Sequence, residues 1–153
     1  MQQHKPGARS LRRGRYSEPG RVYLVTTVVQ AREALFSDWR LGRLVVDEMR
    51  TAHTNDQLRS LAFVLMPDHL HWLFELGAQP LDTVLASVKS RSAKAVNASR
   101  RKTGQVWQRG FHDRAVRREE DIRAIARYIV ANPLRAGLVQ HVGDYPLWDA
   151  VWL

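Results

Sequence analysis

The chain contains no cysteine among its 153 residues. This absence excludes structural disulfides, thiolate zinc sites and a cysteine nucleophile. The chain also lacks any apolar run close to the roughly 20 residues that a membrane-spanning helix needs. Residues 1–16 are polar and basic without an apolar core, so they do not resemble a secretory signal. We therefore expect a cytoplasmic protein with no membrane partner.

Acidic residues are scarce relative to basic ones, with 24 Lys and Arg against 15 Asp and Glu and a formal net charge of +9. Such an excess favours a polyanionic partner, nucleic acid first and an acidic membrane surface second. Two segments, 1–21 and 89–102, hold much of the excess of basic residues. The alternative to a nucleic-acid contact is that these segments are a solvated arm and a solvated helix face. The residues that we expect to contact DNA phosphates are Arg12, Arg13, Arg15, Lys89, Arg91, Lys94, Arg100, Arg101 and Lys102.

A length of 153 residues and a hydrophobic content of 44% are sufficient for one domain with a buried core. We divide the chain into a basic N-terminal arm, residues 1–20, and a single domain, residues 21–153. The breaks at Pro6-Gly7 and Pro19-Gly20 support this boundary. The aromatic tail, from Tyr145 to Trp152, is expected to pack back on the domain.

Hydrophobic periodicity predicts alternating strands and helices along the domain. We expect strands over 21–29 (buried on both faces), 58–66, 69–76 and within 106–116. We expect helices from Ser37 to about Thr54, from about Pro80 to Lys102 with Gly104 just beyond, and from Glu119 to Asn132-Pro133. The order β-α-β-β-α-β-α predicts an α+β, ferredoxin-like antiparallel sheet with helices on one face plus a C-terminal helix. The other sheet face would be free for a ligand.

Two histidines, His69 and His71, lie two residues apart inside the apolar run 66–74. Because side chains alternate along a strand, both imidazoles would point to the same face. Two neighbouring imidazoles form half of a divalent-metal site. The alternative is a pair of partly solvated histidines at a strand edge.

Tyr128 and Asn132 are four residues apart on the last predicted helix, so they lie on one helical face. Taken separately, they are a packing tyrosine with a solvated hydroxyl and a residue that ends a helix before proline. Taken with His69 and His71, they could hold one divalent ion and one nucleophile.

Three blocks of sequence together resemble a REP-associated tyrosine transposase, a branch of the single-tyrosine HUH transposases. The blocks are residues 66–71 (MPDHLH), 104–111 (GQVWQRGF) and 128–139 (YIVANPLRAGLV). The resemblance spans about residues 13–148. Two positions depart from the family pattern: Asp68 stands where the family usually has Asn, and Arg114 where it often has His.

The resemblance implies a role for each matched residue. His69 and His71 would hold Mg²⁺ or Mn²⁺, with Asn132 as a third, polar ligand. Tyr128 would attack a single-stranded DNA phosphodiester, leaving a 5′-phosphotyrosine and a free 3′-hydroxyl. The substrate would be hairpin DNA from repetitive extragenic palindromes, which implies a nucleoid-associated protein. We expect a monomer, with a dimer as the alternative.

Two other functions are consistent with parts of the sequence. A catalytically silent nucleic-acid-binding module could use the same basic segments and sheet. A zinc hydrolase would need a further ligand, but His53, His112 and His141 show no ligand spacing. Three tryptophans, Trp39, Trp72 and Trp107, could stack on unpaired bases, although core packing is the more common use of this residue.

Overall fold

The structure is a computed structural model that describes residues 17–117 and 120–152. The predicted contacts Arg12, Arg13 and Arg15, with most of the arm 1–20, lie outside the described residues. The described strands are β1 (Val22–Val28), β2 (Leu58–Met66), β3 (His69–Leu76), β4 (His112–Ala115) and β5 (Trp148–Ala150). The described α-helices are α2 (Trp39–Thr54), α3 (Leu81–Arg100), α4 (Ile122–Val130) and α5 (Asn132–Arg135). None of them is long and apolar enough to cross a membrane.

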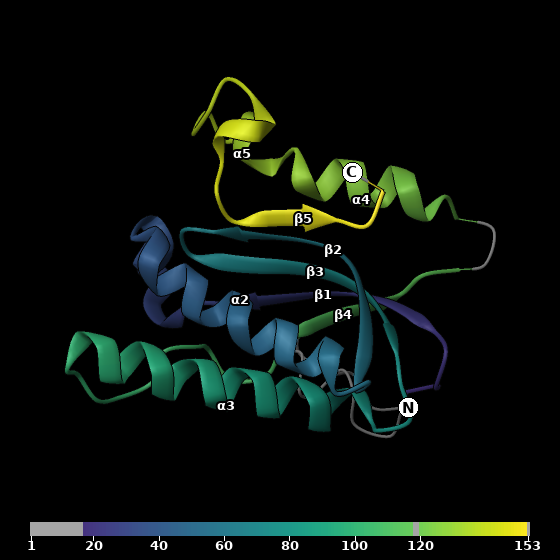
Figure 1. Cartoon of the computed structure of the whole chain (residues 1–153), viewed down its shortest axis with the longest axis horizontal. Coiled ribbons are helices and arrows are strands. Elements are labelled where there is room, and N and C mark those ends of the chain that lie inside the picture. Colours follow the sequence, from purple (N-terminus) through teal and green to yellow (C-terminus); the bar gives the residue numbers. More distant parts are fainter. Residues whose placement is uncertain (1–16, 118–119, 153) are drawn as a thin grey trace, which may run out of the picture.

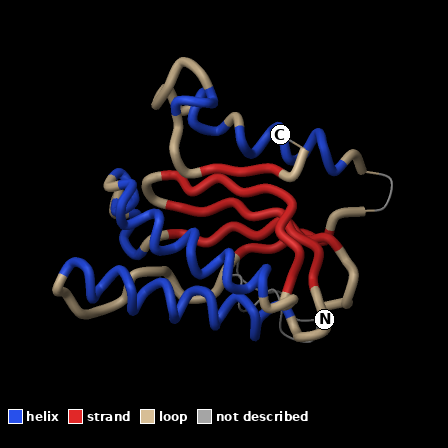
Figure 2. Tube along the Cα trace, in the orientation of Figure 1, coloured by secondary structure: helices blue, strands red, loops and turns tan. Residues whose placement is uncertain are grey.

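The strands form one antiparallel sheet in the order β4-β1-β3-β2-β5 (Figure 2). The first four positions have the strand order of a ferredoxin-like sheet, which confirms the predicted α+β architecture. The sequence pattern did not predict β5, which pairs with the outer edge of β2. This addition covers an edge that would otherwise expose unpaired backbone groups.

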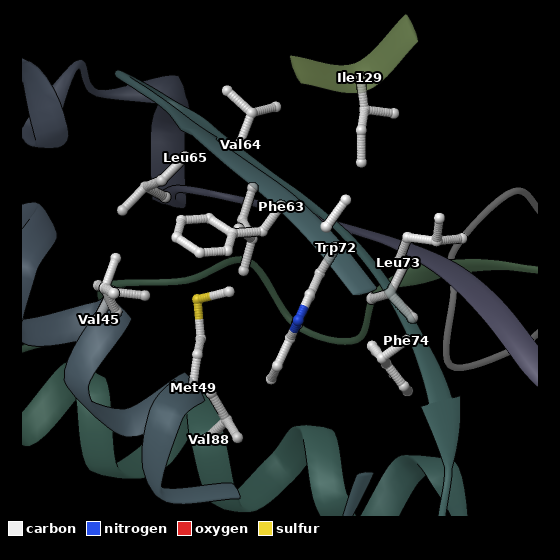
Figure 3. Packing of buried hydrophobic residues seen from close by; sticks show 14 of the residues in the cluster. Val45, Met49, Phe63, Val64, Leu65, Trp72, Leu73, Phe74, Val88 and Ile129 are labelled. Atoms are coloured by element: carbon white, nitrogen blue, oxygen red, sulfur yellow. The ribbon is translucent and has the colours of Figure 1, made fainter. Parts of the chain in front are cut away.

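One face of the sheet is covered by α2 and α3, which lie along each other (Figure 1). Phe63 and Trp72 are partners in the β2–β3 register and point toward this layer. They meet Met49 of α2 and Val88 of α3 in the core (Figure 3). All four side chains are buried. We refer to this side of the sheet as the closed face.

The opposite side carries His69 and His71, and we refer to it as the histidine face. The apolar stripe of α4 packs against β2 and β5 on this side, with Ile129 pointing from the helix toward the side of β2 that carries Val64 (Figure 3). The expectation of a free second face is therefore wrong for the part of the sheet that α4 covers. An amphipathic helix must bury its apolar stripe, and β2 and β5 supply the surface.

Strand β1 is not buried on both faces, contrary to the prediction. Tyr23 and Val25 point to the closed face and are buried, whereas Leu24 and Thr26 on the histidine face are partly exposed. The main contacts of α4 are with β2 and β5, so β1 keeps an accessible side. Valine and threonine are typical of both kinds of strand, and the sequence pattern alone could not separate them.

Three helix ends differ by a few residues from the prediction. The last predicted helix, expected to end at Asn132-Pro133, is followed directly by α5, which runs through Pro133 to Arg135. Helix α2 is capped by Asp38, whose carboxylate accepts from Arg40 N at 3.0 Å, and not by Ser37. Helix α3 ends at Arg100, and the next residue, Arg101, adopts the left-handed conformation (φ 56°, ψ 46°) expected of Gly104. The tail packs on the domain as predicted: Tyr145 Oη donates to Leu65 O at 2.6 Å.

Candidate metal and nucleophile site

The two histidines project from β3 onto the histidine face, as the strand period predicts. In the sheet register His71 lies between Thr26 of β1 and Val64 of β2, and His69 lies beside Val28. The two imidazole centroids are 4.7 Å apart, with an interplanar angle of 78°. The rings therefore share one patch of the rigid sheet and do not compete for the same space.

Each imidazole has a polar partner at Nδ1. Asp68 Oδ1 lies 2.7 Å from His69 Nδ1, and Thr26 Oγ1 lies 2.8 Å from His71 Nδ1. An ionised carboxylate only accepts, so His69 Nδ1 carries the proton and Nε2 keeps its lone pair in the neutral ring. Metal-binding histidines have this arrangement, in which a second group fixes the tautomer and the ring orientation. Asp68, which departs from the family pattern, thus serves as the partner of His69 and is itself 3.4 Å from Arg32 Nε.

The charge state of His71 also suits a ligand. Burial, with the nearby positive charges of His69 and Arg135, lowers the pKa of His71 from 6.5 to about 4. The imidazole is therefore neutral at neutral pH, and a cation does not need to displace a proton from it.

The candidate nucleophile Tyr128 projects from α4 into solvent, with 65% of its surface exposed. Ala131 joins α4 to α5 with helical angles (φ −82°, ψ −1°), so the helical path continues through the junction. Tyr128 and the half-buried Asn132 therefore lie one turn apart, as their spacing predicts. Pro133 is tolerated because it occupies the first turn of α5.

Arg135 connects these residues, although the sequence alone suggested no role for it. Its guanidinium carbon lies 3.8 Å from the centroid of the Tyr128 ring, and its Nη2 donates to Asn132 Oδ1 at 2.8 Å. Its charge also contributes to the lowered pKa of His71. The signal was present in the spacing, since Arg135 is three residues after Asn132 and seven after Tyr128, which places all three on one helical face.

Strand β4 adds two polar residues to the same side of the sheet. His112 pairs with Thr26 and Arg114 with Leu24, so both share the face of His71. Arg114 Nη1 donates to both carboxylate oxygens of Glu120, at 2.9 and 2.8 Å. Within the described ranges no group of three or more His, Asp or Glu side chains could hold a metal ion. A metal at this site would therefore depend on the two imidazoles and a neutral oxygen such as that of Asn132.

The basic residues of α3 lie in the helix layer of the closed face (Figure 1). Arg91, Lys94, Arg101 and Lys102 are exposed there. Arg100 Nη2 is 3.4 Å from Glu33 Oε2. Lys89 Nζ donates to Gln108 O at 2.8 Å and to Gly110 O. The structure thus does not bring these residues together with the histidines.

Two of the three candidate stacking tryptophans are part of the core. Trp72 and Trp107 are buried, and their indole N–H groups donate to Ser60 Oγ at 2.9 Å and Ser92 Oγ at 3.0 Å. Neither ring can stack on a base in this structure, so the packing alternative is correct for both. Trp39 is 48% exposed and lies 4.9 Å from the guanidinium of Arg40.

Comparison with known proteins gives concordant results. The family described as “Transposase IS200 like” matches residues 21–132. A Haemophilus influenzae protein named “Putative REP-associated tyrosine transposase” is 26% identical over 143 residues, covering 83% of this chain and 78% of that protein. The REP-associated tyrosine transposase of Escherichia coli K12 is 29% identical over 87 residues, or 56% of this chain and 50% of that protein.

A solved structure gives the same fold. The structure of a REP-associated tyrosine transposase bound to a REP hairpin superposes with a TM-score of 0.74 at 21% identity. The match covers 97% of this chain and 82% of that chain. These findings confirm the expected resemblance and the fold.

Proposed function

Because this chain belongs to the IS200-like transposase family, we propose that it cleaves and rejoins single-stranded DNA through Tyr128 with the help of a divalent ion. We propose hairpin-forming extragenic palindromes as the substrate, since the structural relative is bound to a REP hairpin. The observation that carries the proposal is the pair of imidazoles with occupied Nδ1 atoms on the sheet face where the Tyr128 helix packs. We propose that the protein acts as a cytoplasmic, nucleoid-associated monomer.

The donor set fits Mg²⁺ or Mn²⁺. The ligands would be His69 Nε2, His71 Nε2 and Asn132 Oδ1. The amide oxygen of Asn132 has two lone pairs, so it can accept a hydrogen bond from Arg135 and still bind a cation. Two imidazoles and one amide oxygen make a sparse set that leaves room for phosphate oxygens and water. When bound, such an ion polarises the scissile phosphate as a Lewis acid.

The residues of this chain supply the nucleophile and its position. Tyr128 Oη attacks the phosphorus, an Oη–P bond forms, and the P–O3′ bond breaks. The phenol proton passes to solvent and O3′ takes up a proton, which leaves a 5′-phosphotyrosine and a free 3′-hydroxyl. The exposure of Tyr128 allows DNA to reach it, and the helix–sheet contact through Ile129 holds the helix over β2.

The affinity for DNA would come in part from basic side chains that lie away from the histidine face. We propose that Arg12, Arg13 and Arg15, with Lys89, Arg91, Lys94, Arg100, Arg101 and Lys102, contact phosphates outside the cleaved segment. A DNA that touches both α3 and Tyr128 would have to pass around the sheet, because the two lie in different layers (Figure 1). Binding of this kind weakens steeply with salt.

An adduct assay tests the proposal. The protein is incubated with 5′- and 3′-labelled single-stranded hairpins taken from repeats beside its own gene, with Mn²⁺ or EDTA, and run on denaturing gels. We expect a metal-dependent covalent band that carries the 3′ label, and its loss in Tyr128→Phe with binding retained. Salt-sensitive binding of several hairpins without any adduct would instead favour a catalytically silent binding module.

A further inference from the structure

Arg135 occupies an unusual position for an arginine. Its guanidinium covers the Tyr128 ring at 3.8 Å, and one N–H group donates to the neutral amide of Asn132. In residues 17–117 and 120–152 no carboxylate lies within ion-pair distance of it. A guanidinium has five N–H donors, so most of the donors of Arg135 have no protein acceptor in that part of the chain.

The other arginines close to the site are already neutralised. Arg32 lies 3.4 Å from Asp68 Oδ2, and Arg114 binds both oxygens of Glu120. These pairs reduce the field that Arg32 and Arg114 exert on a ligand. Arg135 has no such carboxylate partner in the described part of the chain, and its guanidinium lies against the ring of Tyr128.

We propose that Arg135 binds the scissile phosphate and holds it against Tyr128, an inference that rests on the proposed function. The planar fork of a guanidinium matches two non-bridging phosphate oxygens, and charge-assisted pairs of this kind are about twice as strong as neutral hydrogen bonds. Arg135 and Tyr128 are both exposed and their side chains lie against each other, so one phosphodiester can contact both.

Arg135 exchanges no proton and forms no covalent bond in the reaction. Its donors stay on the two non-bridging oxygens while the Oη–P bond forms and the P–O3′ bond breaks. Because those oxygens gain charge in the transition state, its loss should lower both the affinity for the uncleaved DNA and the rate of cleavage.

A phosphate scan separates this role from a structural one. In a Tyr128→Phe background, each phosphate of the hairpin is replaced in turn by a neutral methylphosphonate, and affinity is measured in EDTA so that no divalent ion contacts the cleaved phosphate. We expect neutralisation of the cleaved phosphate to weaken binding about ten-fold in this background. The same replacement should change binding less than about two-fold when Arg135→Gln is added, because the partner is already absent.

Arg127→Gln is the matched control, since Arg127 adjoins Tyr128 on α4 but lies 4.0 Å from Asp121. It should leave the ten-fold effect unchanged. The thermal midpoint of Arg135→Gln should stay within about 2 °C of the parent, as expected for an exposed side chain. Loss of the effect at the cleaved phosphate, specific to Arg135→Gln, would support the proposal.

Two results would overturn it. If the wild type forms the Tyr128 adduct but the scan shows no coupling of Arg135 to the cleaved phosphate, the proposed function stands and the role of Arg135 is wrong. If the wild type forms no adduct with any hairpin, the proposed function fails and this inference fails with it.

Discussion

The two faces of the sheet use polar side chains in opposite ways. On the closed face the two buried indoles are paired: that of Trp72 donates to Ser60 and that of Trp107 to Ser92. On the histidine face, within the described residues, each of the imidazoles of His69 and His71 is bonded through Nδ1 alone, and the ring of Tyr128 is exposed. Polar groups that are fixed in position, accessible and left with spare donors or lone pairs are the ones available for chemistry.

The largest effect should follow from removing both imidazoles. His69→Ala with His71→Ala should reduce adduct formation at least about a thousand-fold, or roughly 4 kcal/mol of transition-state stabilisation. Single-turnover cleavage measures the rate, and urea unfolding should show a loss of stability of at most about 1 kcal/mol. Full cleavage by the double variant would refute the metal assignment.

Substitutions on the two faces should affect stability very differently. Trp72→Ala, which removes a buried indole, should lower the free energy of unfolding by about 3–5 kcal/mol. Tyr128→Ala, on an exposed ring, should lower it by less than about 1 kcal/mol. Urea denaturation compares them, with Trp72→Phe as a milder variant if the alanine variant does not fold. Equal losses would mean that the Tyr128 ring is a packing residue.

Asp68 should affect metal affinity through His69. Asp68→Ala should weaken Mn²⁺ binding about ten-fold to a hundred-fold, because the ring loses the partner that fixes it. Asp68→Asn should weaken Mn²⁺ binding less, since an amide oxygen still accepts a hydrogen bond from His69 Nδ1. Titration of Mn²⁺ followed by electron paramagnetic resonance measures both affinities. An unchanged affinity in Asp68→Ala would show that the contact does not orient a ligand.

The buried hydroxyl of Tyr145 predicts a loss of stability in alkali. Burial raises its pKa to about 12, above the unfolded value near 10, so the folded state holds the proton more tightly. The resulting contribution of Tyr145 to the free energy of unfolding is complete below pH 10. It declines as the pH rises toward 12, and about 1 kcal/mol of it is lost at pH 11. Urea unfolding between pH 8 and 11, with Tyr145→Phe as the reference, should show a smaller decline in the variant. Parallel declines would contradict the assignment.

The smallest effect on catalysis is expected from the α3 cations. Replacing Arg91, Lys94, Arg101 and Lys102 with Gln should leave the cleavage rate of fully bound DNA within about two-fold, since they lie in the other layer. The slope of log affinity against log salt should fall by about one for each phosphate that the variant no longer binds. A large fall in the cleavage rate of fully bound DNA would place α3 near the reacting strand. An unchanged slope of log affinity against log salt would show that these residues do not contact the DNA.

The sequence predicted those parts of the fold that local patterns determine. Both strands of the hairpin and the shared face of His69 and His71 follow from a period of two and the Pro67-Asp68 turn. The pairing of β5 with β2 and the position of α4 could not be predicted, because they depend on contacts between segments far apart in the chain.

The same limit applied to the candidate site. Spacing placed Tyr128 and Asn132 on one helical face, but the contacts of Arg135 with both side chains require the path of the chain through Ala131 and α5. The partners Asp68 and Thr26 show the two cases: the first adjoins its histidine in sequence, whereas the second is 45 residues away and is brought close only by the β1–β3 register.

Mapping the covalent bond is the most direct test of the histidine face as the catalytic face. The protein–DNA adduct formed with Mn²⁺ is digested with nuclease and protease, and the peptides are sequenced by mass spectrometry. We expect a nucleotide 5′-phosphate on the peptide that contains Tyr128. A nucleotide on another residue, such as Tyr23, would contradict it.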